Sequence, residues 1–153
     1  MKAKIIATDV ISEYAGSVYE RTVRFRHKGE EYEVFDSDGV VDSDDVGKTL
    51  DLVIHLFPEA GATVLDGAQR GINPIDNGAS EWAYEIRGSL ETVNGANEWF
   101  DHPPDHLLVV DVGTSTIMVS CYGELLEMVQ AEQLTPGDFV SVRGTRLELI
   151  GRN

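Results

Sequence analysis

The run at residues 106–123, HLLVVDVGTSTIMVSCYG, is the most strongly apolar and β-branched stretch of the chain. Two blocks rich in Val, Ile and Leu flank turn residues at 113–115, a pattern typical of two strands joined by a short reversal. In the second block Ile117, Val119 and Cys121 fall on one face, because side chains alternate along a strand. The first block is apolar on both faces, as in a strand covered on both sides. We therefore predict that this hairpin is the centre of an all-β fold.

Composition limits the classes of protein that this chain can belong to. With 153 residues, 42% of them hydrophobic, it can form one ordinary domain or two small barrels around a substantial core. It carries 12 basic and 27 acidic side chains, a net charge of −15. The first 28 residues hold six basic and three acidic side chains, so the acidic excess lies in the remainder. This charge disfavours non-specific binding to nucleic acid or to anionic lipid.

Cys121 is the only cysteine, so the chain can form neither an internal disulfide nor a Cys-based zinc site. A reducing, cytoplasmic location is the natural expectation. The apolar run at the start is broken by Thr8 and Asp9, too early for a signal-peptide core. No apolar run approaches the roughly 20 residues that cross a bilayer. We expect a soluble protein with no membrane association and no cofactor.

Further strands are predicted from alternating or apolar runs, and the first three of them form an N-terminal meander. The predicted strands cover residues 3–12, 18–27, 31–36, 49–57 and 82–93. Gly88, in the middle of the last of these, predicts a bulge or a sharp bend. After the central hairpin, the apolar spacing in ELLEMVQAEQL predicts one or two helical turns. FVSVR and RLELI then predict a closing hairpin, turned at Gly144-Thr145.

The order of elements from Trp82 onward resembles the OB-fold, a five-stranded barrel with a helix between its third and fourth strands. The stretch LTPGDFVSVRGTRLELIG is similar to the closing hairpin of many such barrels. The resemblance implies an OB-fold-like C-terminal half with one short helix, and an N-terminal β-meander packed against it or extending it. OB-like barrels bind nucleic acids, sugars and proteins, so the fold leaves the ligand open.

The whole chain, residues 1–153, is predicted to form a single compact β domain. Possible sub-modules at 1–57 and 82–153 are then joined by an irregular segment at 58–81. In the first of them VGKTLDLVIHL echoes PGDFVSVRGTRLEL, since both place a glycine and a charge before an alternating strand. A second barrel-like module and one continuous larger barrel or sandwich both fit this pattern.

The first hypothesis for function is a non-enzymatic binding module. Two irregular loops at residues 58–80 and 94–105 are bordered or occupied by the aromatic residues Trp82, Trp99 and Phe100. Long loops on a rigid β-scaffold often carry function, and exposed aromatic side chains can anchor a partner. They can also simply plug the ends of a barrel. The sequence contains neither the G-x-S-x-G nor the phosphate-binding G-x-x-x-x-G-K pattern. We expect a protein partner or a second copy of the chain.

The alternative hypothesis is binding of single-stranded nucleic acid on the predicted second and third strands. Basic and aromatic side chains together contact phosphates and stack on bases. The residues concerned are Arg21, Arg24, Arg26, Tyr32 and Phe35. The competing interpretation is a cross-strand charge ladder, in which the arginines face glutamates of the neighbouring strand.

A third hypothesis is a metal-assisted or small-molecule site at residues 101–106. Imidazole and carboxylate groups suit zinc or another divalent ion. The candidate ligands are Asp101, His102, Asp105 and His106. The intervening Pro103-Pro104 prevents the helix that would bring both imidazoles to one ion. The acidic loop at 36–45 lacks the residue order of an EF-hand, so a solvated loop is the simpler interpretation.

Overall fold

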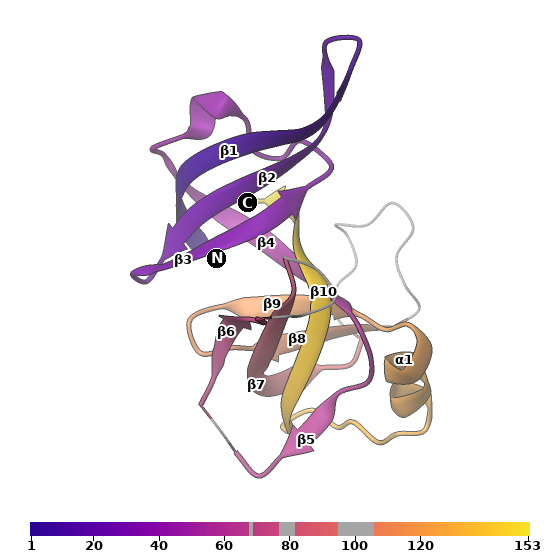
Figure 1. Ribbon diagram of the computed structural model, residues 1–153. Helices are drawn as coiled ribbons and strands as arrows, with labels where there is room; N and C mark the ends of the chain where they lie inside the picture. The colour runs from indigo at the N-terminus through magenta and orange to yellow at the C-terminus, as the bar shows by residue number, and fades with distance from the viewer. Residues whose placement is uncertain (68, 77–81, 95–105) are drawn as a thin grey trace. The chain divides into compact units, whose positions relative to one another are not determined.

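The structure is a computed structural model that describes residues 1–67, 69–76, 82–94 and 106–153 (Figure 1). The predicted all-β class is confirmed, since the described residues contain ten strands in one hydrogen-bonded sheet and a single short α-helix. The elements, in chain order, are β1 (Lys2–Tyr14), β2 (Ser17–His27), β3 (Glu30–Asp36), the 3-10 turn η1 (Ser43–Asp45), β4 (Thr49–Pro58), β5 (Thr63–Leu65), β6 (Gly71–Pro74), β7 (Tyr84–Thr92), β8 (Leu107–Asp111), β9 (Thr116–Ser120), α1 (Gly123–Gln130) and β10 (Phe139–Arg152).

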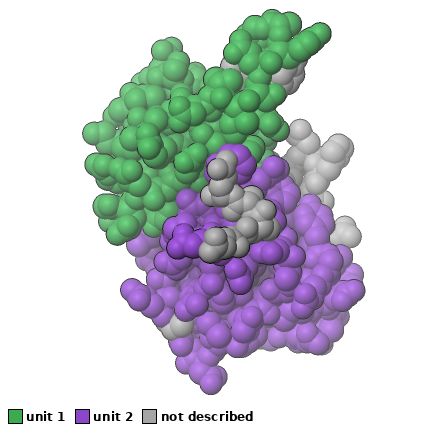
Figure 2. All heavy atoms as spheres, in the orientation of Figure 1, with its two compact units in different colours: residues 1–54, 147–153 green, residues 55–146 purple. Residues whose placement is uncertain are grey.

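The chain divides into two compact units that are interleaved in the sequence (Figure 2). Unit 1 comprises Met1–Ile54 together with Leu147–Asn153, and unit 2 comprises His55–Arg146. The boundaries fall inside β4 and β10, so each of these two long strands supplies residues to both units.

Unit 1 is a ring of five strands. A meander of β1, β2 and β3 is antiparallel throughout, β4 pairs with β1, and the end of β10 pairs in parallel with β3. The backbone N–H of Asn153 donates to the carbonyl of Asp51 at 2.9 Å, which joins the segment after β10 to β4. The apolar side chains that alternate along these strands point into the ring. They include Ile5, Val23, Phe25, Val34, Leu52, Leu147 and Leu149, all at most 1% exposed.

Unit 2 repeats this order of elements with a different meander and with the other parts of β4 and β10. A meander of β7, β8 and β9 is antiparallel, β10 pairs with β7, and the end of β4 pairs in parallel with β9. The N–H of Glu59 donates to the carbonyl of Arg143 at 2.9 Å and joins the residue after β4 to β10. In each unit a meander is followed by a helical segment and a long strand, and the parallel partner comes from the other long strand.

The central hairpin and the helix lie where the sequence predicts them. β8 and β9 pair along their full length, and Leu108, Val110 and Val119 are completely buried. α1 buries Leu125 and Val129, four residues apart on one face. No helix in the described parts of the chain is long and apolar enough to cross a membrane.

The predicted closing hairpin at Gly144-Thr145 is wrong, because β10 continues through both residues as one strand of 14 residues. Gly144 serves close packing instead. A Cβ atom at this position would lie 2.6 Å from Leu56 Cγ and would also overlap the carbonyl oxygen of Phe57. Glycine is therefore required where β10 approaches β4 within unit 2.

Gly88 has a similar role in β7. A Cβ atom there would lie 2.7 Å from the carbonyl carbon of Asp111, so glycine permits the close approach of β8. The register shift between these two strands lies further along, between Leu90 and Thr92. The predicted irregular loop at 58–80 also contains regular structure, since β5 pairs with β10 and β6 pairs with β7. Strands of three and four residues are too short to show a hydrophobic period.

Candidate functional site

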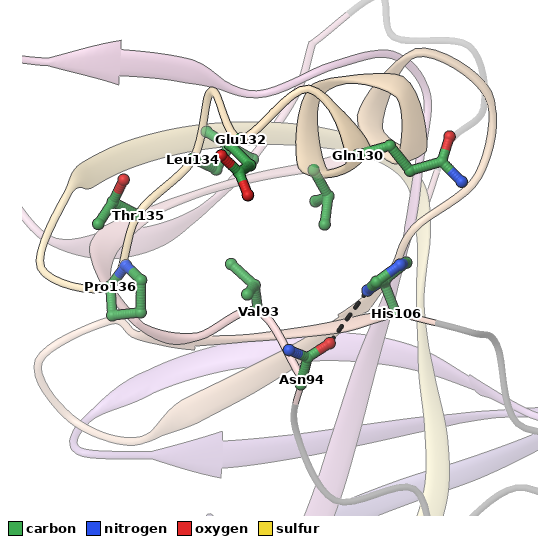
Figure 3. A pocket seen from close by; sticks show the side chains of 9 residues that line it. Val93, Asn94, His106, Gln130, Glu132, Leu134, Thr135 and Pro136 are labelled. Carbon is green, nitrogen blue, oxygen red and sulfur yellow. Dashed lines mark hydrogen bonds between the residues drawn. The ribbon is translucent and has the colours of Figure 1, made fainter.

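The first candidate site is a pocket of about 650 Å³ at the described ends of the 94–105 loop (Figure 3). Its residues come from just after β7, just before β8, and the C-terminal end of α1 with the segment that follows. They are Val93, Asn94, His106, Val129, Gln130, Glu132, Leu134, Thr135 and Pro136. Val93, Val129 and Leu134 are half-buried or buried, while Gln130 and Glu132 are exposed. The pocket thus has an apolar floor and a polar rim, as binding surfaces commonly have.

His106 is held at the edge of this pocket by its neighbour across the loop. Its Nδ1 lies 3.0 Å from Asn94 Oδ1 (Figure 3), and because an amide oxygen only accepts, Nδ1 is the donor. The other three predicted metal ligands, Asp101, His102 and Asp105, lie outside the described residues. Among the residues that the structure describes, no group of three or more His, Cys, Asp or Glu side chains is placed to hold a metal ion.

The second candidate site is a groove on unit 2 between residues 59–63 and α1, which we name the α1 groove. It consists of two adjoining hollows of about 460 and 350 Å³ that share Ala62 and Glu124. The first is lined by Glu59, Ala60, Gly61, Ala62, Thr63, Glu124, Ser141 and Arg143. The second is lined by Ala62, Glu124, Glu127, Met128, Ala131 and Gln133.

The sequence of α1 explains why this groove has an acidic wall. Burial of Leu125 and Val129 fixes the rotation of the helix, which leaves Glu124 and Glu127 exposed. Gly61 allows the helix side chains to come close, since a Cβ atom there would lie 2.7 Å from Met128 Sδ and 3.0 Å from Glu124 Oε1. Apolar spacing identifies the buried face of α1, but the sequence gives no indication that residues 59–63 lie beside it.

The arginines predicted to contact nucleic acid lie in a cross-strand charge ladder on unit 1. Arg24 is directly opposite Glu33, and Arg26 is opposite Glu31, to which its Nη2 donates at 2.5 Å. Arg21 donates through Nη1 to the carbonyl of Val41 at 2.9 Å. The ladder interpretation therefore has a direct structural counterpart, and Arg24 and Arg26 are exposed.

The predicted aromatic contacts have a different environment from these exposed arginines. Phe35 is only 7% exposed, and the ring of half-buried Tyr32 lies 5.6 Å from that of buried Phe25. These two aromatic residues therefore belong largely to the packing of unit 1. Trp82 is half-buried, whereas Trp99 and Phe100 lie outside the described residues.

The carboxylates of the acidic loop at 36–45 contact the loop's own backbone. Buried Asp36 accepts the N–H groups of Val40 and Val41 at 2.8 and 2.9 Å. Burial raises the pKa of Asp36, and these two hydrogen bonds oppose that rise. Asp42 begins η1 by accepting the N–H of Asp44 at 2.9 Å.

Asp45 is the most heavily engaged carboxylate of the same loop. Its side chain is 8% exposed and accepts from Lys48 Nζ at 3.1 Å and from Arg152 Nη1 at 3.0 Å. The hydrogen bond from Lys48 is the main cause that lowers the pKa of Asp45. Asp45 also completes a capping box with Asp42. The carboxylates of this loop therefore stabilise the loop's own conformation.

Unit 2 contains a buried His–Ser pair that the sequence pattern does not predict. In the sequence His55 shares the more polar face of residues 49–57 with Thr49 and Asp51, yet both His55 and Ser120 are at most 1% exposed. His55 Nε2 lies 2.6 Å from Ser120 Oγ and accepts the Ser120 N–H at 3.1 Å. Burial lowers the pKa of His55 to about 4, so the ring is neutral near pH 7. A pair so enclosed links β4 to β9 and is closed to a substrate.

Cys121 follows this pair and is also buried, at 2% exposure. Burial raises the pKa of its thiol to about 11, which keeps the sulfur protonated and unreactive near neutral pH. In the sequence Cys121 shares a strand face with Ile117 and Val119, and in the structure it is packed as a small buried apolar residue.

No known protein family, curated protein or solved structure matches this chain. The functional assignment therefore depends on the geometry of the described residues.

Proposed function

We propose that this chain is a non-enzymatic binding module that contacts a protein partner through the loops at 58–80 and 94–105. The observation that carries the proposal is that both ends of the 94–105 loop and the start of the 58–80 loop line concave surfaces beside the same helix, α1. Asn94 and His106, at the two ends of one loop, line the 650 Å³ pocket. Residues 59–63, at the start of the other, line the α1 groove. A rigid barrel-like scaffold with recognition loops on it is a common arrangement for binding.

The proposal includes an OB-like architecture for each unit. In both units a three-stranded meander is followed by a helical segment and a fourth strand, and a fifth strand completes the ring in parallel with the third. This order of elements supports the resemblance that the sequence suggests from Trp82 onward. It also extends the resemblance to the N-terminal half.

Charge favours a protein partner over a nucleic acid. The net charge is −15, and Glu59, Glu124 and Glu127 line the α1 groove. Phosphates are repelled by such a surface. The alternative nucleic-acid surface on unit 1 would have to displace the Arg26–Glu31 ion pair. A cytoplasmic location is part of the proposal and is supported by the single, buried cysteine.

The test is capture of a partner by a protein with and without an obstructed pocket. The substitution Gln130→Trp places a bulky side chain on an exposed position that lines the 650 Å³ pocket. Thr116→Trp, on an exposed position of β9 outside both candidate sites, is the matched control. We expect the wild type and the control to retain the same protein from a lysate of the source cell, and Gln130→Trp to lose it.

Light scattering on the purified protein distinguishes the two kinds of partner. A dimer that dissociates in the Gln130→Trp variant would identify a second copy of the chain as the partner. A strict monomer that retains no protein from the lysate would contradict the proposal.

A further inference from the structure

We propose that the α1 groove receives a lysine- or arginine-bearing segment of the partner protein. The inference depends on the proposed function, because the groove begins at residues 59–63 of the 58–80 loop. It goes further by specifying the chemistry of the occupant: an aliphatic stem that ends in a positive charge.

The floor of the groove suits an aliphatic stem. Ala62 is 9% exposed, Met128 is half-buried, and Ala131 borders the same hollow of about 350 Å³. Lys and Arg side chains bury their methylene groups on apolar surface while the charged end stays near water. The flexible, polarisable thioether of Met128 can adapt to such a stem.

The wall of the groove suits the charged end. Glu124 and Glu127 are exposed, lie three positions apart on α1, and both line the hollow that contains Met128. A carboxylate and an ammonium or guanidinium group form charge-assisted hydrogen bonds, which are stronger than neutral ones.

Arg143 determines which end of the groove the charged end of the occupant binds. It lines the other hollow, where it lies with Glu59 and Glu124. A cation is repelled by the guanidinium of Arg143, so the charged end of the occupant belongs near Glu127. The stem then lies over Ala62 and Met128.

The experiment is a titration of ¹⁵N-labelled protein with synthetic ten-residue peptides, followed by two-dimensional amide NMR. One peptide alternates arginine with alanine. In two matched peptides every arginine is replaced by norleucine, which keeps a stem without the charge, or by glutamate. We expect saturable shifts at the amides of Gly61, Ala62, Met128 and Ala131 with the arginine peptide alone. Binding should weaken as salt rises, because exposed charges are screened.

Charge variants test the direction of the groove. The double substitution Glu124→Gln and Glu127→Gln should weaken binding roughly tenfold or more, since hydrogen bonds to charged groups are among the strongest. Arg143→Gln should strengthen binding. Glu91→Gln, on an exposed position of β7 outside the groove, should leave binding unchanged. Unchanged amide spectra in the absence of peptide show that each variant is folded.

Three results would overturn the inference. They are equal binding of the norleucine peptide, shifts located away from the groove, and no shift with the arginine peptide. If the lysate partner is still captured and Gln130→Trp still abolishes capture, the proposed function stands while the inference fails. If the peptide binds as expected and no partner is captured, the groove is assigned and the proposed function fails.

A second copy of this chain could also supply the basic side chain that binds in the α1 groove. Lys28 is exposed in the tight turn after β2. A concentration-dependent dimer that is lost in Lys28→Gln would replace the partner protein by a second copy and would overturn this part of the inference.

Discussion

At the scale of single residues, His55 makes the stability of unit 2 depend on pH. An unfolded histidine has a pKa near 6.5, whereas burial lowers that of folded His55 to about 4. Between these values the unfolded chain binds more protons, so acid favours unfolding. The His55 contribution to the free energy of unfolding should be constant above pH 6.5. It should fall by roughly 3 kcal/mol by pH 4. Urea denaturation across this range measures it.

The control is the same series on His55→Gln, which has no titrating group at this position. Asp36 contributes the opposite slope at the acid end. Because its pKa is raised in the folded protein, the folded state binds the proton more readily than the unfolded chain and gains stability as the pH falls. That contribution is common to both proteins and cancels in the comparison. If the glutamine variant loses stability just as steeply between pH 6.5 and pH 4, His55 is not the source of the effect.

The role of Gly144 could not be predicted from the sequence. Glycine before a threonine and a second apolar run indicates a turn. This prediction failed because the local pattern carries no information about β4. The structure instead requires close approach to Leu56 and Phe57. Gly144→Ala should therefore lower the free energy of unfolding by about 1–3 kcal/mol, the usual cost of overpacking. Gly71→Ala, where the nearest atom would be 3.6 Å away, should change it little. Equal effects in urea denaturation would contradict this explanation.

At the scale of elements, η1 depends on one carboxylate. Asp45 joins the capping box to Lys48 and to Arg152 of β10, all within unit 1. Asp45→Asn should destabilise unit 1 by about 1–2 kcal/mol, because a cap and two charge-assisted hydrogen bonds are weakened. Asp44→Asn, a neighbouring exposed position, is the control. Amide hydrogen exchange of β3 and β4 distinguishes the two variants, and equal protection in both would refute the prediction.

The elements also show what a single sequence can and cannot predict. Strands such as β2 and β4 were predictable because alternation of Val23 and Phe25, or of Leu52 and Ile54, is local. The burial of His55 was not, because β9, which pairs with that end of β4, lies far along the chain. For the same reason the apolar spacing predicted α1 but gave no sign of the groove beside it.

At the scale of the whole molecule, unit 1 needs residues from a distant part of the sequence. Leu147 and Leu149 belong to the core of unit 1, although they follow all of unit 2 in the chain. A chain that ends at Arg146 should therefore lose the folded amide signals of unit 1 and keep those of unit 2, which lacks none of its residues. Two-dimensional NMR with assigned amides measures this. Retention of the unit 1 signals would show that its ring does not need the end of β10.

The echo between VGKTLDLVIHL and PGDFVSVRGTRLEL has a counterpart at this scale. Both segments begin the long strand that follows a helical element, β4 after η1 and β10 after α1. The sequence suggested a repeated module. It did not indicate that the end of β10 pairs with β3 in unit 1 while the end of β4 pairs with β9 in unit 2, an arrangement that we call the exchange of strand ends. That exchange depends on pairing partners such as Glu148 with Phe35, which lie far apart in the chain.

This exchange of strand ends reverses the usual order of maturation on the ribosome. Domains generally acquire their structure from the N-terminus as they emerge. Here the ring that contains residues 1–54 stays open until residues 147–153 have left the exit tunnel, whereas residues 55–146 are contiguous and can close first. While translation continues, the nascent meander of β1, β2 and β3 leaves an unpaired strand edge, the kind of surface that chaperones shield and that stalled chains aggregate through.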